Sequence, residues 1–305
     1  MRPQAWRLRA KSTPLRPTST ALRVLYYALG GGRGHATRSR LLSQWFPVGS
    51  DVHFILPQRL QSWSRGLQVH LVNPSSLGAQ VAQLLRQLRP DLLLVDTFPR
   101  GVLGELAELD FPCPAWLVAR WLKLSYATRP EVLSALDRYQ QVLNCELTPW
   151  ERGCQIGPVV APPAQPQGTR EIVWLGSGPV QAQRLLSQAL PAQAVVAAPD
   201  LGQPRQDVAQ LLASASLVIS ASGYNAYHEI VQAGTPVIFW PQARLYDEQN
   251  LRAHGRLGPK PRGWHRCVDD LPGFQAALAE WQENHPATAG PEILARPDWV
   301  RALFT

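Results

Sequence analysis

The sequence predicts an α/β protein made of two doubly wound parallel-sheet domains that face each other across a cleft. Three observations support this. Strand-like apolar runs alternate with helix-like runs along most of the chain, a proline-rich stretch interrupts them, and the first strand-like run on each side ends in glycines. Strands that alternate with helices imply parallel sheets with right-handed crossovers. We therefore predict a basic tail at 1–20, an N-terminal domain at 21–160, a linker at 161–168 and a C-terminal domain at 169–305.

The composition is that of a globular protein. The chain has 305 residues, which is enough for two domains of ordinary size. Hydrophobic residues make up 45% of it and charged residues 17%, as in globular proteins. The net charge is +8, but the first twenty residues supply +5 and no acid, so the body carries only 8 − 5 = +3. We therefore read residues 1–20 as a disordered tail and expect no nucleic-acid partner.

Cysteine usage and hydropathy indicate the cellular compartment of the protein. The four cysteines form no CxxC pair, which fits a reducing compartment better than a disulfide framework or a zinc ribbon. No apolar run reaches the roughly 18 residues that a membrane-spanning helix needs. A cytoplasmic protein is the expectation.

The N-terminal half alternates strands and helices in a regular order. The helix at 75–88, for example, places Val81, Leu84, Leu85 and Leu88 on one face. Predicted strands cover 23–28, 51–56, 68–72, 91–95, 115–119 and 141–145, and predicted helices cover 36–46, 75–88, 104–109 and the region near 131–139.

The pattern restarts after four prolines between residues 158 and 166, which break both helix and strand. Predicted strands in this half cover 171–175, 194–198, 217–221 and 236–240, and predicted helices cover 180–190, 207–215, 223–233, 247–254 and 271–281.

A glycine-rich loop with a histidine follows the first strand. It reads Gly30-Gly31-Gly32-Arg33-Gly34-His35, without the spacing of a dinucleotide fingerprint. Glycines such as Gly32 and Gly34 let the backbone approach a ligand closely, and open α/β sheets bind ligands at this edge. A neutral imidazole at a helix start is suited to act as a general base, whereas the alternative is a histidine that only caps the helix.

Asp96 follows the strand at 91–95 and reaches the same edge of the sheet. It could orient His35 and stabilise its protonated form, as the acid does in a His/Asp pair, or it could cap the next helix. Arg120 also ends a strand, where contact with a phosphate or acceptor competes with a simple salt bridge.

The residues between 217 and 253 carry the strongest functional pattern. A strand runs into Ser222-Gly223 and a helix begins, so free backbone N–H groups form an anion site. Asn225 adds a side-chain donor in the first turn, and Glu229, further along this helix, can accept hydrogen bonds from a ribose diol.

Two further groups complete the predicted donor site. Gly176, Ser177 and Gly178 follow the first strand of this half and would supply the other part of a diphosphate cradle. Asp247, Gln249 and Asn250 open the next helix of the predicted nucleotide-sugar site, where the amide side chains could bind sugar hydroxyls. No DxD motif occurs, so we expect neither a metal nor another cofactor, with the nucleotide sugar as co-substrate.

The segment from Ser222 to Asn250 resembles the nucleotide-binding half of GT-B glycosyltransferases, above all the MurG family. That family uses a strand–Ser-Gly–helix–Glu unit, an Ala-Gly-x-Pro strand and an Asp-x-Gln-Gln helix, read here as Ser222-Gly223, Glu229, Ala233 to Pro236 and Asp247 to Asn250. The resemblance implies two Rossmann-like domains, a UDP-sugar donor, and contacts to phosphate at Ser222 and Gly223, to ribose at Glu229 and to sugar at Gln249 and Asn250. It also implies that His35 is the base.

The leading hypothesis is thus an inverting, metal-independent glycosyltransferase with an unidentified acceptor, either lipid-linked or a small molecule. The stretch from Gly32 to Arg38 also resembles the loop of a nucleotide-sugar hydrolase of the same fold, and a non-catalytic nucleotide-sugar-binding protein is a third alternative. Peripheral membrane contact through Trp121, Leu122, Leu124 and Tyr126 competes with a buried strand-to-helix turn, which we favour.

Overall fold

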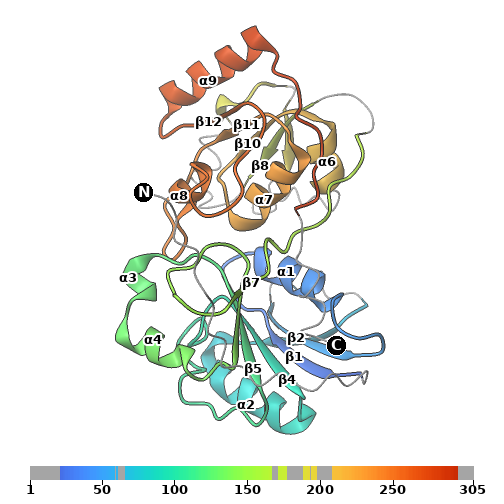
Figure 1. The fold of residues 1–305 in the computed structure, drawn as a ribbon, viewed down its shortest axis with the longest axis vertical. Helices are drawn as coiled ribbons and strands as arrows, with labels where there is room; N and C mark the ends of the chain where they lie inside the picture. Colours follow the sequence, from blue (N-terminus) through green and yellow to red (C-terminus); the bar gives the residue numbers. More distant parts are fainter. Residues whose placement is uncertain are drawn as a thin grey trace.

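The computed structural model describes residues 21–58, 60, 66–166, 171–176, 188–192, 194–197 and 208–294. These residues form two parallel sheets, each covered by helices and stacked end to end (Figure 1). The predicted fold class is confirmed. None of the helices in these ranges is long and apolar enough to cross a membrane.

The first sheet has seven strands in the order β3-β2-β1-β4-β5-β6-β7. All of its pairings are parallel. Its strands are β1 (Arg23–Tyr27), β2 (Asp51–Pro57), β3 (Gln68–Val72), β4 (Leu92–Asp96), β5 (Ala115–Ala119), β6 (Gln141–Asn144) and β7 (Cys154–Gln155). The strand order reverses at β1, which pairs with both β2 and β4. The carboxyl ends of β1 and β4 therefore lie side by side.

Both faces of this sheet are buried. Leu25 and Tyr27 belong to one apolar cluster and Val24 and Tyr26 to another, as expected when successive side chains point to opposite faces. The helices are α1 (Gly34–Ser43), α2 (Leu77–Leu88), α3 (Leu124–Ala127) and α4 (Pro130–Leu136), with a 3-10 turn at Pro74–Ser76.

The predicted helix at 104–109 is wrong. This segment is a turn, and Gly104 adopts a φ of 90°. The side chain of Arg138 donates hydrogen bonds to the carbonyl groups of Leu106, Ala107 and Leu109. The distant arginine satisfies these carbonyls, so the segment needs only two short-range backbone bonds, from Ala107 to Gly104 and from Leu109 to Leu106, and no helix.

The second sheet has five strands in the order β12-β11-β10-β8-β9, again all parallel. They are β8 (Glu171–Leu175), β9 (Val195–Ala197), β10 (Ala215–Ser220), β11 (Val237–Phe239) and β12 (His265–Cys267). Its helices are α6 (Val208–Ser214), α7 (Tyr224–Ala233), α8 (Gln249–Ala253) and α9 (Leu271–Asn284). Most of the predicted helix at 180–190, the tail at 1–20 and residues 167–168 of the linker lie outside the described residues.

The two halves make direct contact (Figure 1). Tyr224, the first residue of α7, packs into an apolar cluster of the first sheet, and its hydroxyl accepts the Val159 N–H at 2.9 Å. The Lys123 N–H donates to the Tyr246 carbonyl at 2.9 Å, and the Leu147 N–H donates to the Leu257 carbonyl at 3.1 Å. These three bonds join the two halves, and the contact of Tyr224 places the start of α7 beside the first sheet.

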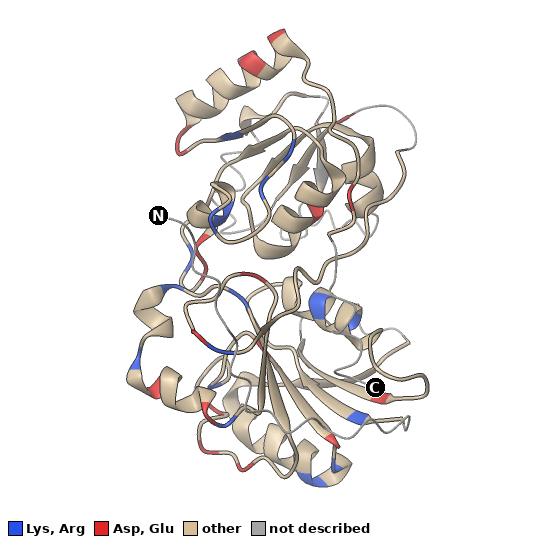
Figure 2. Ribbon diagram, in the orientation of Figure 1, with Lys and Arg blue, Asp and Glu red and all other residues tan. Residues whose placement is uncertain are grey.

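Charges are spread over both halves. Figure 2 shows basic and acidic positions along the ribbon of each half, with no long stretch of one sign. This agrees with the small excess of +3 that the sequence assigns to the body of the chain.

Candidate functional site

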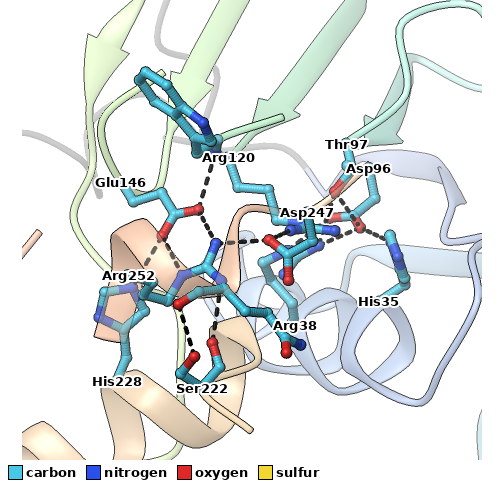
Figure 3. A network of polar contacts seen from close by, with 12 residues as sticks. His35, Arg38, Asp96, Thr97, Arg120, Glu146, Ser222, His228, Asp247 and Arg252 are labelled. Carbon is cyan, nitrogen blue, oxygen red and sulfur yellow. Dashed lines mark hydrogen bonds and ion pairs between the residues drawn. The ribbon is translucent and has the colours of Figure 1, made fainter. Parts of the chain in front are cut away.

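The structure brings His35 and Asp96 together. Asp96 is the last residue of β4, and His35 lies in the first turn of α1, which follows the neighbouring strand β1. The Nδ1 atom of His35 is 2.5 Å from Oδ2 of Asp96, and both side chains are buried (Figure 3). The predicted pair therefore forms at the carboxyl edge of the first sheet, where parallel α/β sheets bind ligands.

The direction of this hydrogen bond fixes the chemistry of the imidazole. An ionised carboxylate only accepts hydrogen bonds, so Nδ1 carries the proton and Nε2 keeps its lone pair. Burial lowers the pKa of His35, and Asp96 opposes that effect only in part. His35 is thus neutral at pH 7 and holds a basic nitrogen, as a general base requires.

Gly30 makes room for this ring. A Cβ atom on Gly30 would overlap the imidazole of His35, whereas one on Gly31 would meet no heavy atom within 4 Å. The glycine after β1 is therefore needed for its lack of a side chain, because the backbone passes directly over the ring.

We expect Gly30→Ala to displace His35 and to lower turnover by about 100-fold or more, since general-base catalysis is commonly worth 10²–10⁴. Gly31→Ala is the matched control and should keep the wild-type rate. Steady-state kinetics of the two variants make the comparison. Equal rates in the two would show that His35 does not need its present position.

Arg38 ends the stretch that resembles the hydrolase loop, and in the structure it is a site residue for which no role of its own was predicted. Its Nε donates to Oδ1 of Asp96 at 2.8 Å and its Nη2 to Oδ2 at 2.5 Å. It lies three residues after His35, and residues at this spacing share one face of a helix. That spacing is the signal that could have identified it.

Backbone strain marks the ends of two strands at the site. Thr97, directly after β4, has a φ of 72°, and Ser222, after β10, has a φ of 58°. Left-handed conformations are costly for residues with a side chain and occur often at functional sites.

The start of α7 faces α1. Gly223 precedes the helix and Tyr224 begins it, so the first backbone N–H groups have no partner within the helix. The Oδ1 atom of Asn225 is buried without a hydrogen-bond partner, and a Cβ atom on Gly34 would lie 3.5 Å from it. The Ser222 hydroxyl, in contrast, donates to the Gln249 carbonyl at 2.8 Å, so it links α7 to α8 in this structure.

Ion pairs cross between the two halves beside this helix (Figure 3). Asp247 accepts from Arg120 of the first half at 2.8 Å and from Arg252 at 2.9 Å. Arg252 also forms an ion pair with Glu146, which follows β6, at 2.7 Å. His228 of α7 lies 3.3 Å from the same carboxylate. Asp247, predicted to bind the nucleotide sugar, is therefore part of a network that joins the halves.

This network predicts a loss of stability in acid. Arg252 and His228 hold the pKa of Glu146 at about 2 against the desolvation that would raise it, well below its ordinary value of 4.5. A carboxylate with a depressed pKa stabilises the fold above its unfolded pKa, and this contribution is lost as the pH falls toward the folded value.

Urea unfolding at a series of pH values should therefore show the free energy of unfolding of the wild type decreasing between about pH 5 and pH 2. Glu146→Gln cannot lose this proton-linked contribution, so its curve should be shallower over the same range. Parallel curves for the two proteins would contradict the assignment.

A small pocket adjoins the network at the start of α8. Its volume is about 200 Å³, and its lining includes Lys123, Gln242, Asp247, Gln249 and Asn250. The Gln249 side chain is buried and accepts the Gln242 N–H at 2.9 Å, whereas Asn250 is exposed. Three of the residues predicted to bind the nucleotide sugar thus lie around one pocket.

The remaining predicted donor residues lie in different surroundings. Glu229 accepts the Ala161 N–H, and burial raises its pKa to about 7. Gly176 is buried, and its N–H donates to the Ala197 carbonyl at 3.1 Å. Gly32 is exposed, whereas Gly34 faces Asn225. Ser177 and Gly178 lie outside the described residues.

Glu146, His228 and Arg252 belong to none of the predicted motifs, whereas Arg38 ends the stretch that resembles the hydrolase loop. Glu146 follows a strand at the same edge as Asp96, which is a signal that could have drawn attention to it. His228 and Arg252 lie within helices and gave no such signal, because only the approach of the two halves defines their partners.

The segment considered for membrane contact is largely internal. Leu122 and Tyr126 belong to the apolar core, while Leu124 is 54% exposed. The favoured interpretation of a buried turn therefore describes Leu122 and Tyr126, and the geometry offers no support for membrane contact.

No family model matches the sequence, and no curated protein matches it. Solved structures do match its fold. The spinosyn rhamnosyltransferase SpnG complexed with thymidine diphosphate has a TM-score of 0.54 and 18% identity, with 86% of this chain and 92% of that chain covered. The calicheamicin glycosyltransferase CalG4 has a TM-score of 0.52 and 17% identity, with 86% and 90% covered.

The glycotransferase of kitacinnamycin is similar at a TM-score of 0.53 and 14% identity, with 85% of this chain and 90% of that chain covered. At these identities the likeness concerns the fold, which is the GT-B arrangement of two facing α/β halves. The closer resemblance to the MurG family stays a prediction.

Proposed function

We propose that this protein is an inverting, metal-independent glycosyltransferase that moves a sugar from a UDP-linked donor to an acceptor hydroxyl. The observation that carries the proposal is the buried His35–Asp96 pair at the edge of the first sheet, facing the start of α7. Solved proteins of the same fold support it, since they are named glycosyltransferases and one is a complex with thymidine diphosphate.

The reaction would use His35 as the base. Nε2 takes the proton of the acceptor hydroxyl while that oxygen attacks the anomeric carbon. The bond from this carbon to the diphosphate breaks on the opposite side, which inverts the configuration. Asp96 stabilises the imidazolium that forms, and the nucleoside diphosphate leaves with the bonding electrons.

The donor site that we propose is centred on α7. The leaving diphosphate would accept hydrogen bonds from the first N–H groups of the helix, whose dipole favours negative charge. We assign the ribose to Glu229 and the sugar to the pocket at Gln249 and Asn250. Ligand pockets usually measure about 300–1,000 Å³, so a pocket of about 200 Å³ holds a sugar-sized group and not the whole donor. Donor binding would therefore involve relative movement of the halves.

The acceptor side of His35 is aromatic. The Phe98 ring stacks on the imidazole with centroids 5.8 Å apart, and Tyr246 contacts Phe98 at 5.4 Å. Tyr126 packs edge-on against Tyr246 at 4.9 Å. Aromatic walls favour an acceptor with an apolar part, in a small molecule or a lipid-linked one.

Hydrolysis of the nucleotide sugar is the second candidate. The observation in its favour is the bidentate pairing of Arg38 with Asp96, because the loop that resembles the hydrolase motif includes this arginine. Water would then replace the acceptor, and the same residues would act in the same roles.

Release of free nucleoside diphosphate tests these alternatives. The protein would be incubated with a panel of UDP- and dTDP-sugars, with and without EDTA and acceptor mixtures. Acceptor-dependent release that EDTA does not change supports the transferase, and acceptor-independent release supports the hydrolase. Binding without release under every condition would leave a non-catalytic nucleotide-sugar-binding protein, and absence of binding would reject the proposal.

A further inference from the structure

Arg38 is buried in α1 with its guanidinium against the catalytic pair, yet the reaction proposed above gives it no role. It donates through Nε to one oxygen of Asp96 and through Nη2 to the other. Nη2 also lies 3.0 Å from Oγ1 of Thr97, the strained residue that follows β4. The planar fork of arginine matches a carboxylate in one orientation, so these bonds fix the rotation of Asp96.

The same guanidinium contacts the other half of the protein. Its central carbon lies 4.8 Å from the centroid of the Tyr224 ring. Tyr224 begins α7 directly after Gly223, where the proposed diphosphate site lies. Its hydroxyl is held by the Val159 N–H, so the ring has a fixed place at the junction of the two halves. Arg38 is thus in contact with both the catalytic carboxylate and the start of the donor helix.

We infer that Arg38 is a positioning residue that aims Asp96 at Nδ1 of His35 and, through the Tyr224 ring, makes this alignment depend on the placement of α7. The inference rests on the proposed function, in which His35 is the base. Arg38 reaches neither donor nor acceptor in this role and acts through the two side chains that it contacts.

The charges around His35 define what removal of Arg38 should do. Asp96 faces the imidazole from β4, Arg38 from α1, and Arg120 from the end of β5. Arg120 is paired with Asp247 across the junction. Loss of Arg38 would leave the negative charge of Asp96 to stabilise the imidazolium form, so the proton affinity of His35 should rise.

Nuclear magnetic resonance titration of the histidine rings in the full-length protein measures this directly, with His35→Gln used for assignment. Arg38→Met should raise the pKa of His35 by about 1 unit or more, the size of effect known for neighbouring charges. Arg40→Met is the control, because Arg40 is exposed on the same helix, and it should shift this pKa by less than about 0.3 units. Equal shifts in the two variants would overturn the inference.

Arg38→Lys keeps the charge and serves if Arg38→Met does not fold. It lacks the fork, so Asp96 should lose its fixed orientation and the imidazole should no longer show the Nδ1–H tautomer alone. We expect kcat to fall by about tenfold or more with KM within about twofold. A Lys variant with wild-type tautomer and kcat would overturn the role of the fork.

The link to α7 is tested at Tyr224. Tyr224→Leu removes the ring face and should alter both the pKa of His35 and kcat, whereas Tyr224→Phe keeps the ring face, loses only the hydrogen bond with the Val159 N–H, and should have a clearly smaller effect on both. Identical behaviour of the two variants would overturn the link. If no nucleotide sugar turns over, the proposed function fails, and the titrations still decide whether Arg38 sets the protonation and tautomer of His35.

Discussion

His35→Ala is expected to lower kcat by about 10²–10⁴-fold, the usual contribution of a positioned general base. Nucleotide affinity should stay within about twofold, because the proposed diphosphate site lies on α7 and not on α1. Steady-state kinetics together with calorimetric titration of UDP measure the two quantities. His265→Ala is the control, since His265 is exposed on β12, and it should behave as the wild type.

Asp96→Asn should have a comparable effect for a different reason. Arg38 donates to both carboxylate oxygens, so an asparagine amide in either orientation would set its NH₂ group against an N–H group of Arg38. The neutral side chain would also no longer stabilise the imidazolium that forms when His35 takes the proton. If either His35→Ala or Asp96→Asn kept more than about a tenth of the wild-type kcat while folded, the assignment of the pair would be wrong.

Arg252→Met is expected to destabilise the protein by about 3–5 kcal/mol, the cost of removing one partner from a buried ion pair. Arg252 is fully buried and pairs with both Glu146 and Asp247, so its loss leaves two carboxylates with fewer partners. Scanning calorimetry should show Tm lower by about 10 °C.

The control for this variant is Arg256→Met. Arg256 is exposed four residues later and should change the free energy of unfolding by less than about 0.5 kcal/mol. The double variant Glu146→Leu with Arg252→Met should recover part of the loss, because no unpaired partner of that pair remains. A wild-type Tm in Arg252→Met would show that the network does not hold the halves together.

The alternation of strands and helices could be predicted because each element carries its own period. The strands β1, β5 and β8 and the helix α7 lie within one residue of their predicted positions. The short elements β7, β12 and α3 were not predicted, since two to four residues give too little periodicity. The helix predicted at 104–109 is a turn because a distant arginine, Arg138, satisfies its carbonyls, which no local pattern indicates.

The candidate site, like the fold, could be predicted only in part. His35 and Asp96 could be paired because Asp96 ends one strand and His35 begins the helix that follows a neighbouring strand. Parallel strands bring their carboxyl ends together at one edge of the sheet. The roles of Glu146, His228 and Arg252 depend on how one half rests on the other, which no local pattern encodes. For the same reason the sequence predicts Asp247 only as part of the nucleotide-sugar site, although it also joins the halves through Arg120.

The most direct test of the account is a crystal structure of the His35→Ala protein with an intact UDP-sugar bound. We expect the diphosphate oxygens to accept hydrogen bonds from the first backbone N–H groups of α7, next to Gly223. The anomeric carbon should face the position of the missing imidazole beside Asp96. A nucleotide bound away from α7, or a sugar turned away from Asp96, would contradict the proposed site and with it the role of His35.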